Sequence, residues 1–182
     1  MEKIKGEALH GFFFESLRRT DSYIASADQK ASFTLAGGLA FLAIYASLFD
    51  KVISFPDTTL SKMSMLSLIG ISIIPWIVWF YKIMKVFNPN VTPGKEISYV
   101  SFATLCVQNK TKDDFLERLS GDLYELDTEG LIRDVAENYW ICSRICLDKM
   151  AAFRSSLNWL TISIAFTILV ISLFSFLKSG IL

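Results

Sequence analysis

The side chains able to do acid–base or nucleophilic chemistry form no recognisable catalytic motif in this sequence. It has no phosphate-binding loop, dinucleotide fingerprint, zinc-protease helix or serine-hydrolase elbow. The only histidine, His10, stands beside Gly11 and Phe12 and is interpreted as a surface or packing residue. The acidic residues between positions 117 and 129 are interpreted as solvated helix faces. We therefore expect that the protein is not an enzyme and has no catalytic residues.

Cysteine spacing offers one further possibility for chemistry. Cys142 and Cys146 lie one helical turn apart, a spacing that can bind a metal ion or sense redox state. The nearby sequence supplies no third or fourth ligand, so both are interpreted as small apolar residues of a helix. With Cys106 the number of cysteines is odd, which argues against a disulfide framework. We expect no metal site.

Three uncharged apolar runs dominate the chain, at residues 31–49, 63–81 and 157–177. Each is 19 to 21 residues long and contains no Asp, Glu, Lys, Arg or His. As helices rising about 1.5 Å per residue, they are long enough to cross the hydrocarbon core of a bilayer. The polar remainder of 182 residues is too short to cover three such helices in water. These runs predict an integral membrane protein with three transmembrane helices.

The distribution of basic residues predicts how the chain is oriented. Near the ends of the apolar runs, nine basic residues lie in segments 1–30 and 82–156, against three in segments 50–62 and 178–182. Basic residues accumulate on the cytoplasmic side of membrane proteins. We therefore expect segments 1–30 and 82–156 in the cytoplasm and segments 50–62 and 178–182 outside. The overall charge balance of 18 basic and 18 acidic residues gives no reason to expect a nucleic-acid partner.

The cytoplasmic segments are expected to be mainly helical, which makes the fold class all-α. Residues 7–30 have apolar positions at helical spacing and are expected to continue into the first span without a break. A helix is expected to open at Thr111, which forms a capping box with Asp114. Another is expected to start at Thr128 and to run without Gly or Pro from residue 131 into the third span. Residues 97–107 fit either a short strand or a helix.

Similar charged sequences precede the first and third spans. Asp28 and Lys30 stand just before the first, and Asp148 and Lys149 just before the third. One interpretation is that opposite charges simply mark the membrane boundary. The other is that these four residues form a coupling point, which passes a cytoplasmic rearrangement to the spans.

A resemblance rests on these boundary sequences and on the three-span arrangement. Ala27-Asp28-Gln29-Lys30-Ala31-Ser32 leads into the first span, while residues 131–135 and then Lys149-Met150-Ala151 lead into the third. In these features the chain resembles the transmembrane effectors of bacterial Pycsar anti-phage systems. The resemblance implies a multi-pass protein of the bacterial inner membrane with a cytoplasmic N-terminus. It also implies a partner pyrimidine cyclase that makes cyclic CMP or cyclic UMP on infection, whereupon the effector impairs the membrane and causes abortive infection.

If the resemblance holds, a cyclic pyrimidine mononucleotide is the expected ligand of segment 82–156. Its phosphate needs cationic or backbone N–H partners, and its base can stack on an aromatic ring. The candidate residues are Arg18, Arg19, Arg133, Tyr139, Trp140, Arg144 and Lys149. No other cofactor is expected.

Two alternative functions also fit the sequence. One is a membrane-anchored scaffold that recruits a cytoplasmic partner through helices in segment 97–150. The other is a small channel or transporter subunit, against which the absence of ionisable residues in the spans argues. A homo-oligomer is a further hypothesis, because Ala36, Gly37, Gly38, Ala40 and Ala43 give the first span a small-residue surface that permits close helix approach.

Overall fold

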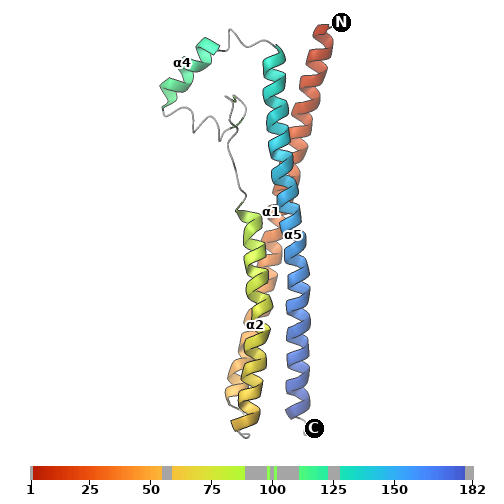
Figure 1. Cartoon of the computed structure of the whole chain (residues 1–182), viewed down its shortest axis with the longest axis vertical. Helices are drawn as coiled ribbons and strands as arrows, with labels where there is room; N and C mark the ends of the chain where they lie inside the picture. The colour runs from red at the N-terminus through yellow and green to blue at the C-terminus, as the bar shows by residue number, and fades with distance from the viewer. Residues whose placement is uncertain are drawn as a thin grey trace. The chain divides into compact units, whose positions relative to one another are not determined.

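The computed structural model describes residues 2–54, 59–88, 98, 101, 111–122 and 128–178. These residues form four helices, α1 (Glu2–Ile53), α2 (Thr59–Phe87), α4 (Lys112–Asp122) and α5 (Thr128–Lys178) (Figure 1). No strand occurs in the described part of the chain. Of the ambiguous stretch 97–107, only residues 98 and 101 lie within the described residues, and neither belongs to a helix or strand.

The chain divides into two compact units, and two helices contribute to both. Unit 1 comprises Met1–Ser26 and Pro89–Asp148, and unit 2 comprises Ala27–Asn88 and Lys149–Leu182. Helix α1 has 52 residues and α5 has 51. Each of them therefore begins in unit 1 and ends in unit 2 without a break in the helix. This confirms the prediction that the helices before the first and third spans continue into those spans.

Unit 2 is a bundle of α1, α2 and α5. Its first core cluster contains Ala31, Trp76, Trp79, Ile83 and Val86, with partly buried side chains of α5 packed against it. A second core cluster unites residues of all three helices, namely Tyr45, Met65, Ile69 and Val170. The buried positions of α1 in this unit include residues 31, 38 and 45, a seven-residue spacing typical of left-handed helix packing. One face of α1 is thus buried in the bundle along these positions.

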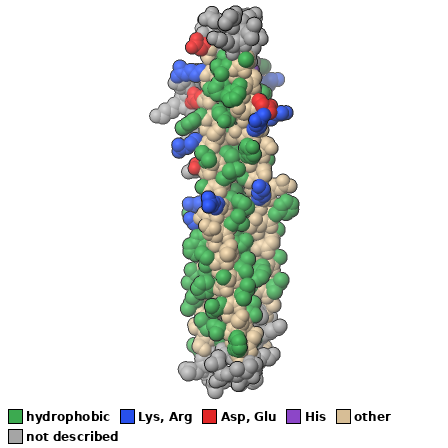
Figure 2. Space-filling model, turned by 90° about the vertical axis from the view of Figure 1, so that its right-hand side faces the viewer, with side chains coloured by type: hydrophobic (Ala, Val, Ile, Leu, Met, Phe, Trp, Pro, Cys, Tyr) green, Lys and Arg blue, Asp and Glu red, His purple; other side chains and the backbone are tan. Residues whose placement is uncertain are grey.

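Three helices are long and apolar enough to span a membrane. They extend over Ala8–Ser47, Lys62–Phe87 and Glu129–Phe176 and contain the three predicted spans. Large apolar side chains of unit 2 are exposed, among them Phe33, Ile44 and Ile77. Figure 2 shows many hydrophobic side chains on the face that it draws. Such exposure is costly in water but normal in lipid. The prediction of an all-α integral membrane protein with three transmembrane helices is confirmed.

The helix ends differ in part from the predicted segment boundaries. Helix α1 continues to Ile53 and α2 begins at Thr59, so the predicted 50–62 loop is helical at both of its ends. The physical reason is that a helix does not have to end where the hydrocarbon ends, since its backbone hydrogen bonds remain satisfied beyond it. Pro75 lies inside α2.

The capping box predicted at Thr111 is present. The Thr111 backbone N–H donates to Asp114 Oδ2 at 3.1 Å, and the Asp114 N–H donates to Thr111 Oγ1 at 3.1 Å. These reciprocal bonds satisfy two donors that the first turn of a helix leaves free. Helix α4 accordingly begins at the next residue, Lys112.

Candidate functional site

A charged pair links α1 and α5 at the point where both helices enter unit 2. Lys149 Nζ donates to Asp28 Oδ1 at 2.5 Å and to Oδ2 at 2.7 Å. The Lys149 side chain is 7% exposed and that of Asp28 is 38% exposed. Unit 2 starts at Ala27 on one helix and at Lys149 on the other, so the pair lies in the first turn of the unit. The site is therefore a direct bridge between the two continuous helices.

The burial of Lys149 makes this pair more consequential than a surface ion pair. An ammonium removed from water needs a counter-charge, and short charge-assisted hydrogen bonds to both carboxylate oxygens provide it. Removing one member leaves the other charge uncompensated, which is much costlier than losing an exposed pair. The bridge therefore favours one register of α1 against α5.

The four predicted coupling residues have different surroundings. The structure brings Asp28 and Lys149 together. The ion pair therefore joins the sequence before the first span to the sequence before the third, and not two residues of the same sequence. Lys30 and Asp148 are both exposed. The ammonium of Lys149, which was also a candidate phosphate ligand, is bonded to Asp28 and buried. That arrangement suits an interhelical link better than a nucleotide contact.

A tryptophan cluster lies next to the charged bridge along the bundle. Ala31, one helical turn after Asp28, belongs to the same core cluster as Trp76 and Trp79. The two indole rings meet edge-on at 5.5 Å between centroids, and Trp76 also stacks on Phe41 at 5.8 Å. Trp79 is fully buried. These rings fix α1 against α2 by shape.

Gly38 is where α1 approaches this cluster most closely. A Cβ atom added at Gly38 would lie 2.3 Å from Cη2 and 2.5 Å from Cζ2 of Trp79. At the neighbouring Gly37, a Cβ would have no atom within 4 Å. Of the small residues noted in the first span, Gly38 thus provides space for an indole ring of α2. Sequence reasoning identified the small-residue surface but not its partner.

Two hydrogen bonds between side chains join the helices of unit 2 further along. Trp76 Nε1 donates to Thr167 Oγ1 at 3.1 Å and connects α2 with α5. The hydroxyls of Tyr45 and Ser72 hydrogen-bond to each other and connect α1 with α2. Sequence reasoning missed these four residues. The available signal was the placement of hydroxyl-bearing and indole side chains inside apolar runs, where they need a partner.

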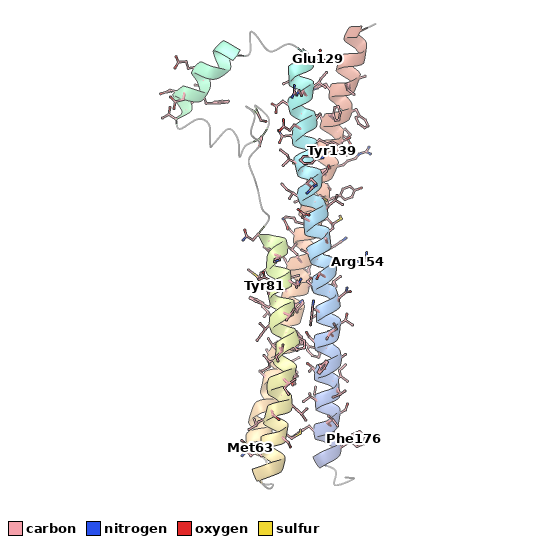
Figure 3. The ribbon with its side chains drawn as sticks, viewed as in Figure 1. Met63, Tyr81, Glu129, Tyr139, Arg154 and Phe176 are labelled. Carbon is pink, nitrogen blue, oxygen red and sulfur yellow. The ribbon has the colours of Figure 1, made fainter. Side chains whose placement is uncertain are left out.

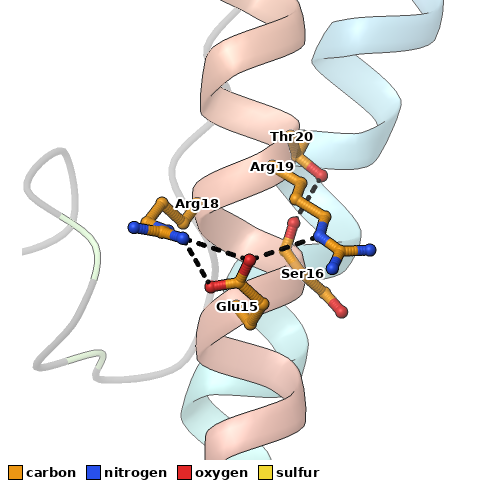
Figure 4. Close-up of polar contacts among 5 residues, drawn as sticks. All are labelled: Glu15, Ser16, Arg18, Arg19 and Thr20. Carbon is orange, nitrogen blue, oxygen red and sulfur yellow. Dashed lines mark hydrogen bonds and ion pairs between the residues drawn. The ribbon is translucent and has the colours of Figure 1, made fainter.

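In unit 1, the two arginines of α1 that were candidate phosphate ligands share one carboxylate. Arg18 and Arg19 both contact Glu15, at 3.1 and 3.3 Å (Figure 4). Their hydrogen bonds hold the pKa of the Glu15 carboxyl below its usual value. Both arginine side chains are more than 70% exposed. Exposed guanidinium groups remain accessible to an anion, but Glu15 competes for them.

The candidate residues on α5 do not converge on one point. Tyr139, marked in Figure 3, is half-buried and its ring approaches Phe13 of α1 at 6.2 Å. Trp140 is exposed, and the guanidinium of Arg144 lies over its ring at 5.5 Å. Arg133 is also exposed. Trp140 and Arg144 therefore form a stacked aromatic–cation pair, whereas Tyr139 contributes to packing between α1 and α5.

Unit 1 also contains a polar contact between side chains that the sequence did not predict. Asn138 is buried on α5, and its Nδ2 donates to Ser98 Oγ at 3.1 Å. The backbone N–H of Ser101 donates to the same hydroxyl at 2.9 Å. This contact ties the chain after α2 to α5 within unit 1. No local sequence signal could have identified it, because the partners are 40 residues apart.

The cysteines of α5 lie in an apolar environment. Burial, and the negative charge of Asp21, raise the pKa of the Cys142 thiol. Burial also raises the pKa of Cys146. Both groups are thereby kept protonated and weakly nucleophilic at neutral pH. Among the described residues, no cluster of three or more His, Cys, Asp or Glu side chains is arranged to hold a metal ion.

Comparison with known proteins identifies the family. Residues 12–176 match the family model of the Pycsar effector protein domain. The chain belongs to the Pycsar effector family. The match covers α1 from residue 12 onward, α2, α4 and nearly all of α5, so it includes the charged bridge and the tryptophan cluster. Comparison with curated proteins and with solved structures gives no match.

Family membership confirms the resemblance inferred from the boundary sequences. It supports a role in Pycsar anti-phage defence and a functional link to a cyclase system. Together with the three membrane-spanning helices, it also supports a location in a membrane. Lipid is accordingly one partner of this Pycsar effector.

Proposed function

We propose that this Pycsar effector responds to a cyclic pyrimidine mononucleotide, cyclic CMP or cyclic UMP, by impairing the bacterial inner membrane. The messenger comes from a partner pyrimidine cyclase activated on infection, and the damage causes abortive infection. The protein catalyses no reaction and needs no metal or cofactor. Its N-terminus and segment 82–156 lie in the cytoplasm, where the messenger is made.

The observation that carries this proposal is the sharing of α1 and α5 by the two units. Each helix runs from unit 1 into the bundle of unit 2 with no intervening loop. A ligand that favours one arrangement of these helices in unit 1 therefore changes the strain on the same helices in unit 2. A ligand shifts such an equilibrium only by its differential affinity for the two arrangements.

The Asp28–Lys149 bridge gives the transmitted movement a defined point of action. The bridge is the first polar link between α1 and α5 in unit 2, and its short bonds hold the two helices in one register. Separating the pair would leave a buried ammonium without its counter-charge, so α1 and α5 are expected to move together at this point. We infer that the intact bridge passes a movement of one helix to the other, so that its loss uncouples the membrane bundle from the messenger.

Recognition of the messenger is assigned to exposed cationic and aromatic side chains of unit 1. Trp140 and Arg144 already present a ring beside a guanidinium, which suits a base and a phosphate respectively. Arg18 and Arg19 offer further cations on α1. Arg133 is proposed as a further cation for the phosphate. Tyr139 is proposed to support the site by packing between α1 and α5.

Co-expression in bacteria tests the proposal. Cells that carry the effector and an active pyrimidine cyclase are expected to lose membrane potential and admit a DNA dye when the cyclase is induced. A cyclase with an inactivated catalytic site serves as the control. Accumulation of cyclic CMP or cyclic UMP without depolarisation would count against the proposal.

The same cells test the coupling residues. The variant Asp28→Ala with Lys30→Ala is expected to abolish killing while the protein remains inserted and abundant. The matched control is Lys30→Ala alone, which removes an exposed charge and leaves the bridge intact. Killing by the double variant at the wild-type level would refute the coupling role.

A further inference from the structure

Basic side chains from all three helices of unit 2 lie at one level along the bundle. The Asp28–Lys149 bridge aligns α1 with α5, and the close approach of Gly38 to Trp79 aligns α1 with the antiparallel α2. Counted from Asp28 at about 1.5 Å of rise per residue, four basic positions lie about 3–11 Å further along the bundle. This basic layer consists of Lys30, Lys82, Lys85 and Arg154.

The basic layer has the depth and thickness of a lipid headgroup region. On each helix it adjoins one of the uncharged apolar runs, 31–49, 63–81 and 157–177. The layer extends over about 8 Å along the helices, and the headgroups of one leaflet occupy about 5–8 Å. Figure 3 shows Tyr81 and Arg154 at similar levels of α2 and α5. Lys85 Nζ lies 4.9 Å from the centre of the exposed Tyr81 ring, a residue pair typical of the membrane interface.

The cations of the basic layer have no acidic partner. Within residues 27–49, 62–87 and 149–178 the only acidic residue is Asp28, and Lys149 bonds to both of its carboxylate oxygens. The charged groups of Lys30, Lys82 and Arg154 form no hydrogen bond or ion pair with any residue that the structure describes. All members of the layer are exposed except Lys82, which is half-buried. This level of unit 2 therefore carries uncompensated positive charge.

On α5 an amide extends the basic layer toward the apolar run. Asn158 follows Arg154 by one helical turn, so both exposed side chains lie on one face of the helix, with the amide about 6 Å deeper. The Asn158 carboxamide also lacks a hydrogen bond to any described residue. A guanidinium offers five N–H donors and a carboxamide two, which suits phosphodiester oxygens and the ester oxygens below them. Exposed Leu157 and Ile162 provide apolar surface beside the pair.

We propose that the basic layer binds the headgroups of anionic phospholipids, and that Arg154 and Asn158 hold one phosphodiester on α5. Phosphatidylglycerol has a phosphodiester and no ammonium group, so it supplies the negative charge that this level of unit 2 lacks. A zwitterionic headgroup supplies no net charge. Each Lys or Arg near an anionic surface strengthens the attraction about five-fold. The proposal concerns the lipid partner and holds whether or not a cyclic nucleotide is the signal.

Lipid selectivity tests the basic layer. The full-length protein is placed in phosphatidylcholine vesicles, and a trace of spin-labelled phosphatidylglycerol or phosphatidylcholine reports by electron paramagnetic resonance the lipid held at the protein surface. Phosphatidylglycerol is expected to associate about five-fold more strongly, and less so at high salt, which screens exposed charges.

Two variants with all four positions changed complete this test. The preference is expected to disappear in the variant that combines Lys30→Gln, Lys82→Gln, Lys85→Gln and Arg154→Gln. It is expected to persist in the matched control, in which each of these lysines is arginine and Arg154 is replaced by lysine, because the charges remain. No preference in the wild-type protein, or an unchanged preference in the glutamine variant, would overturn the proposal.

Photo-cross-linking tests the position on α5. Vesicles contain the full-length protein and phosphatidylglycerol with a diazirine near its headgroup, and mass spectrometry locates the adducts, which are expected within residues 151–162. Arg154→Gln with Asn158→Leu is expected to lower their yield about five-fold or more. Ser67→Leu is the control, because that exposed hydroxyl on α2 bonds to the Ser64 backbone oxygen.

Inorganic phosphate in large excess separates a lipid site from a site for free anions. The adducts are expected to persist in its presence, because the acyl chains hold the lipid at this depth. Adducts confined to other segments would overturn the assignment to Arg154 and Asn158. Loss of the adducts on adding phosphate would show that the site takes a free anion, and the lipid proposal would fail.

Discussion

The contact between Gly38 and Trp79 allows a sharp test of how the membrane bundle is packed. Non-bonded carbon atoms rest about 3.5–4.0 Å apart. The Cβ of Gly38→Ala would lie 2.3 Å from Trp79 Cη2, so the atoms must separate by more than 1 Å. Trp79 is fully buried and meets Trp76 edge-on, which leaves the ring little room to move. The helices must therefore separate or the ring must leave its preferred rotamer.

The expected magnitude comes from comparing two adjacent glycines. Overpacking a filled site costs about 1–3 kcal/mol. Replacing glycine by alanine in a helix interior otherwise gains about 1 kcal/mol from backbone propensity. Gly37→Ala receives this gain without a clash, since no atom lies within 4 Å of the added Cβ. The difference in unfolding free energy between Gly38→Ala and Gly37→Ala therefore isolates the clash, at about 1–3 kcal/mol.

Reversible unfolding in mixed detergent micelles measures this difference. Increasing sodium dodecyl sulfate is added to protein in a mild detergent, and helix content is followed by circular dichroism. Gly37→Ala should unfold at or above the wild-type midpoint, and Gly38→Ala clearly below it. Equal midpoints for the two variants would refute the close packing of α1 against Trp79.

Three further outcomes are expected. Asp28→Ala should lower the unfolding free energy by about 1–3 kcal/mol. This loss is smaller than that expected on breaking a fully buried ion pair, because the Asp28 side chain is 38% exposed. The double variant Asp28→Leu with Lys149→Met, which removes both charges, should recover most of the loss in the same assay. Burial and the charge of Asp21 raise the pKa of Cys142, so iodoacetamide should alkylate this thiol slowly at about pH 7.5 and faster as the pH rises. Asp21→Asn should shift this increase in alkylation rate to lower pH. Mass spectrometry of the alkylated protein measures both rates. Thr111→Ala should destabilise the start of α4 by about 1 kcal/mol, visible as faster amide exchange in its first turn.

Local sequence signals were sufficient for the spans and for the starts of α4 and α5. Uncharged runs of sufficient length predict membrane helices because lipid leaves the backbone no other partner. The absence of helix breakers predicted that the helices continue beyond the membrane, as α1 and α5 do. The capping box at Thr111 was predictable because both of its members lie within four residues.

The contacts of the site depend on tertiary structure and were only partly predictable. Asp28 and Lys149 were identified by their places before two spans, but nothing local indicates that they pair across 121 residues. Whether Asp28 faces Lys149 depends on how α1 is rotated and shifted along its axis relative to α5. The same holds for the Trp76–Thr167 bond, which needs the register of α2 against α5.

We propose that a cyclic pyrimidine mononucleotide acts directly on this effector to open or disorder the membrane. Purified protein in sealed vesicles loaded with a self-quenched dye tests it with no other component present. Addition of cyclic CMP or cyclic UMP to vesicles with the nucleotide-accessible orientation is predicted to release the dye, and cyclic AMP is predicted to release none. Full retention of the dye with both cyclic pyrimidines would show that neither nucleotide acts directly on the effector.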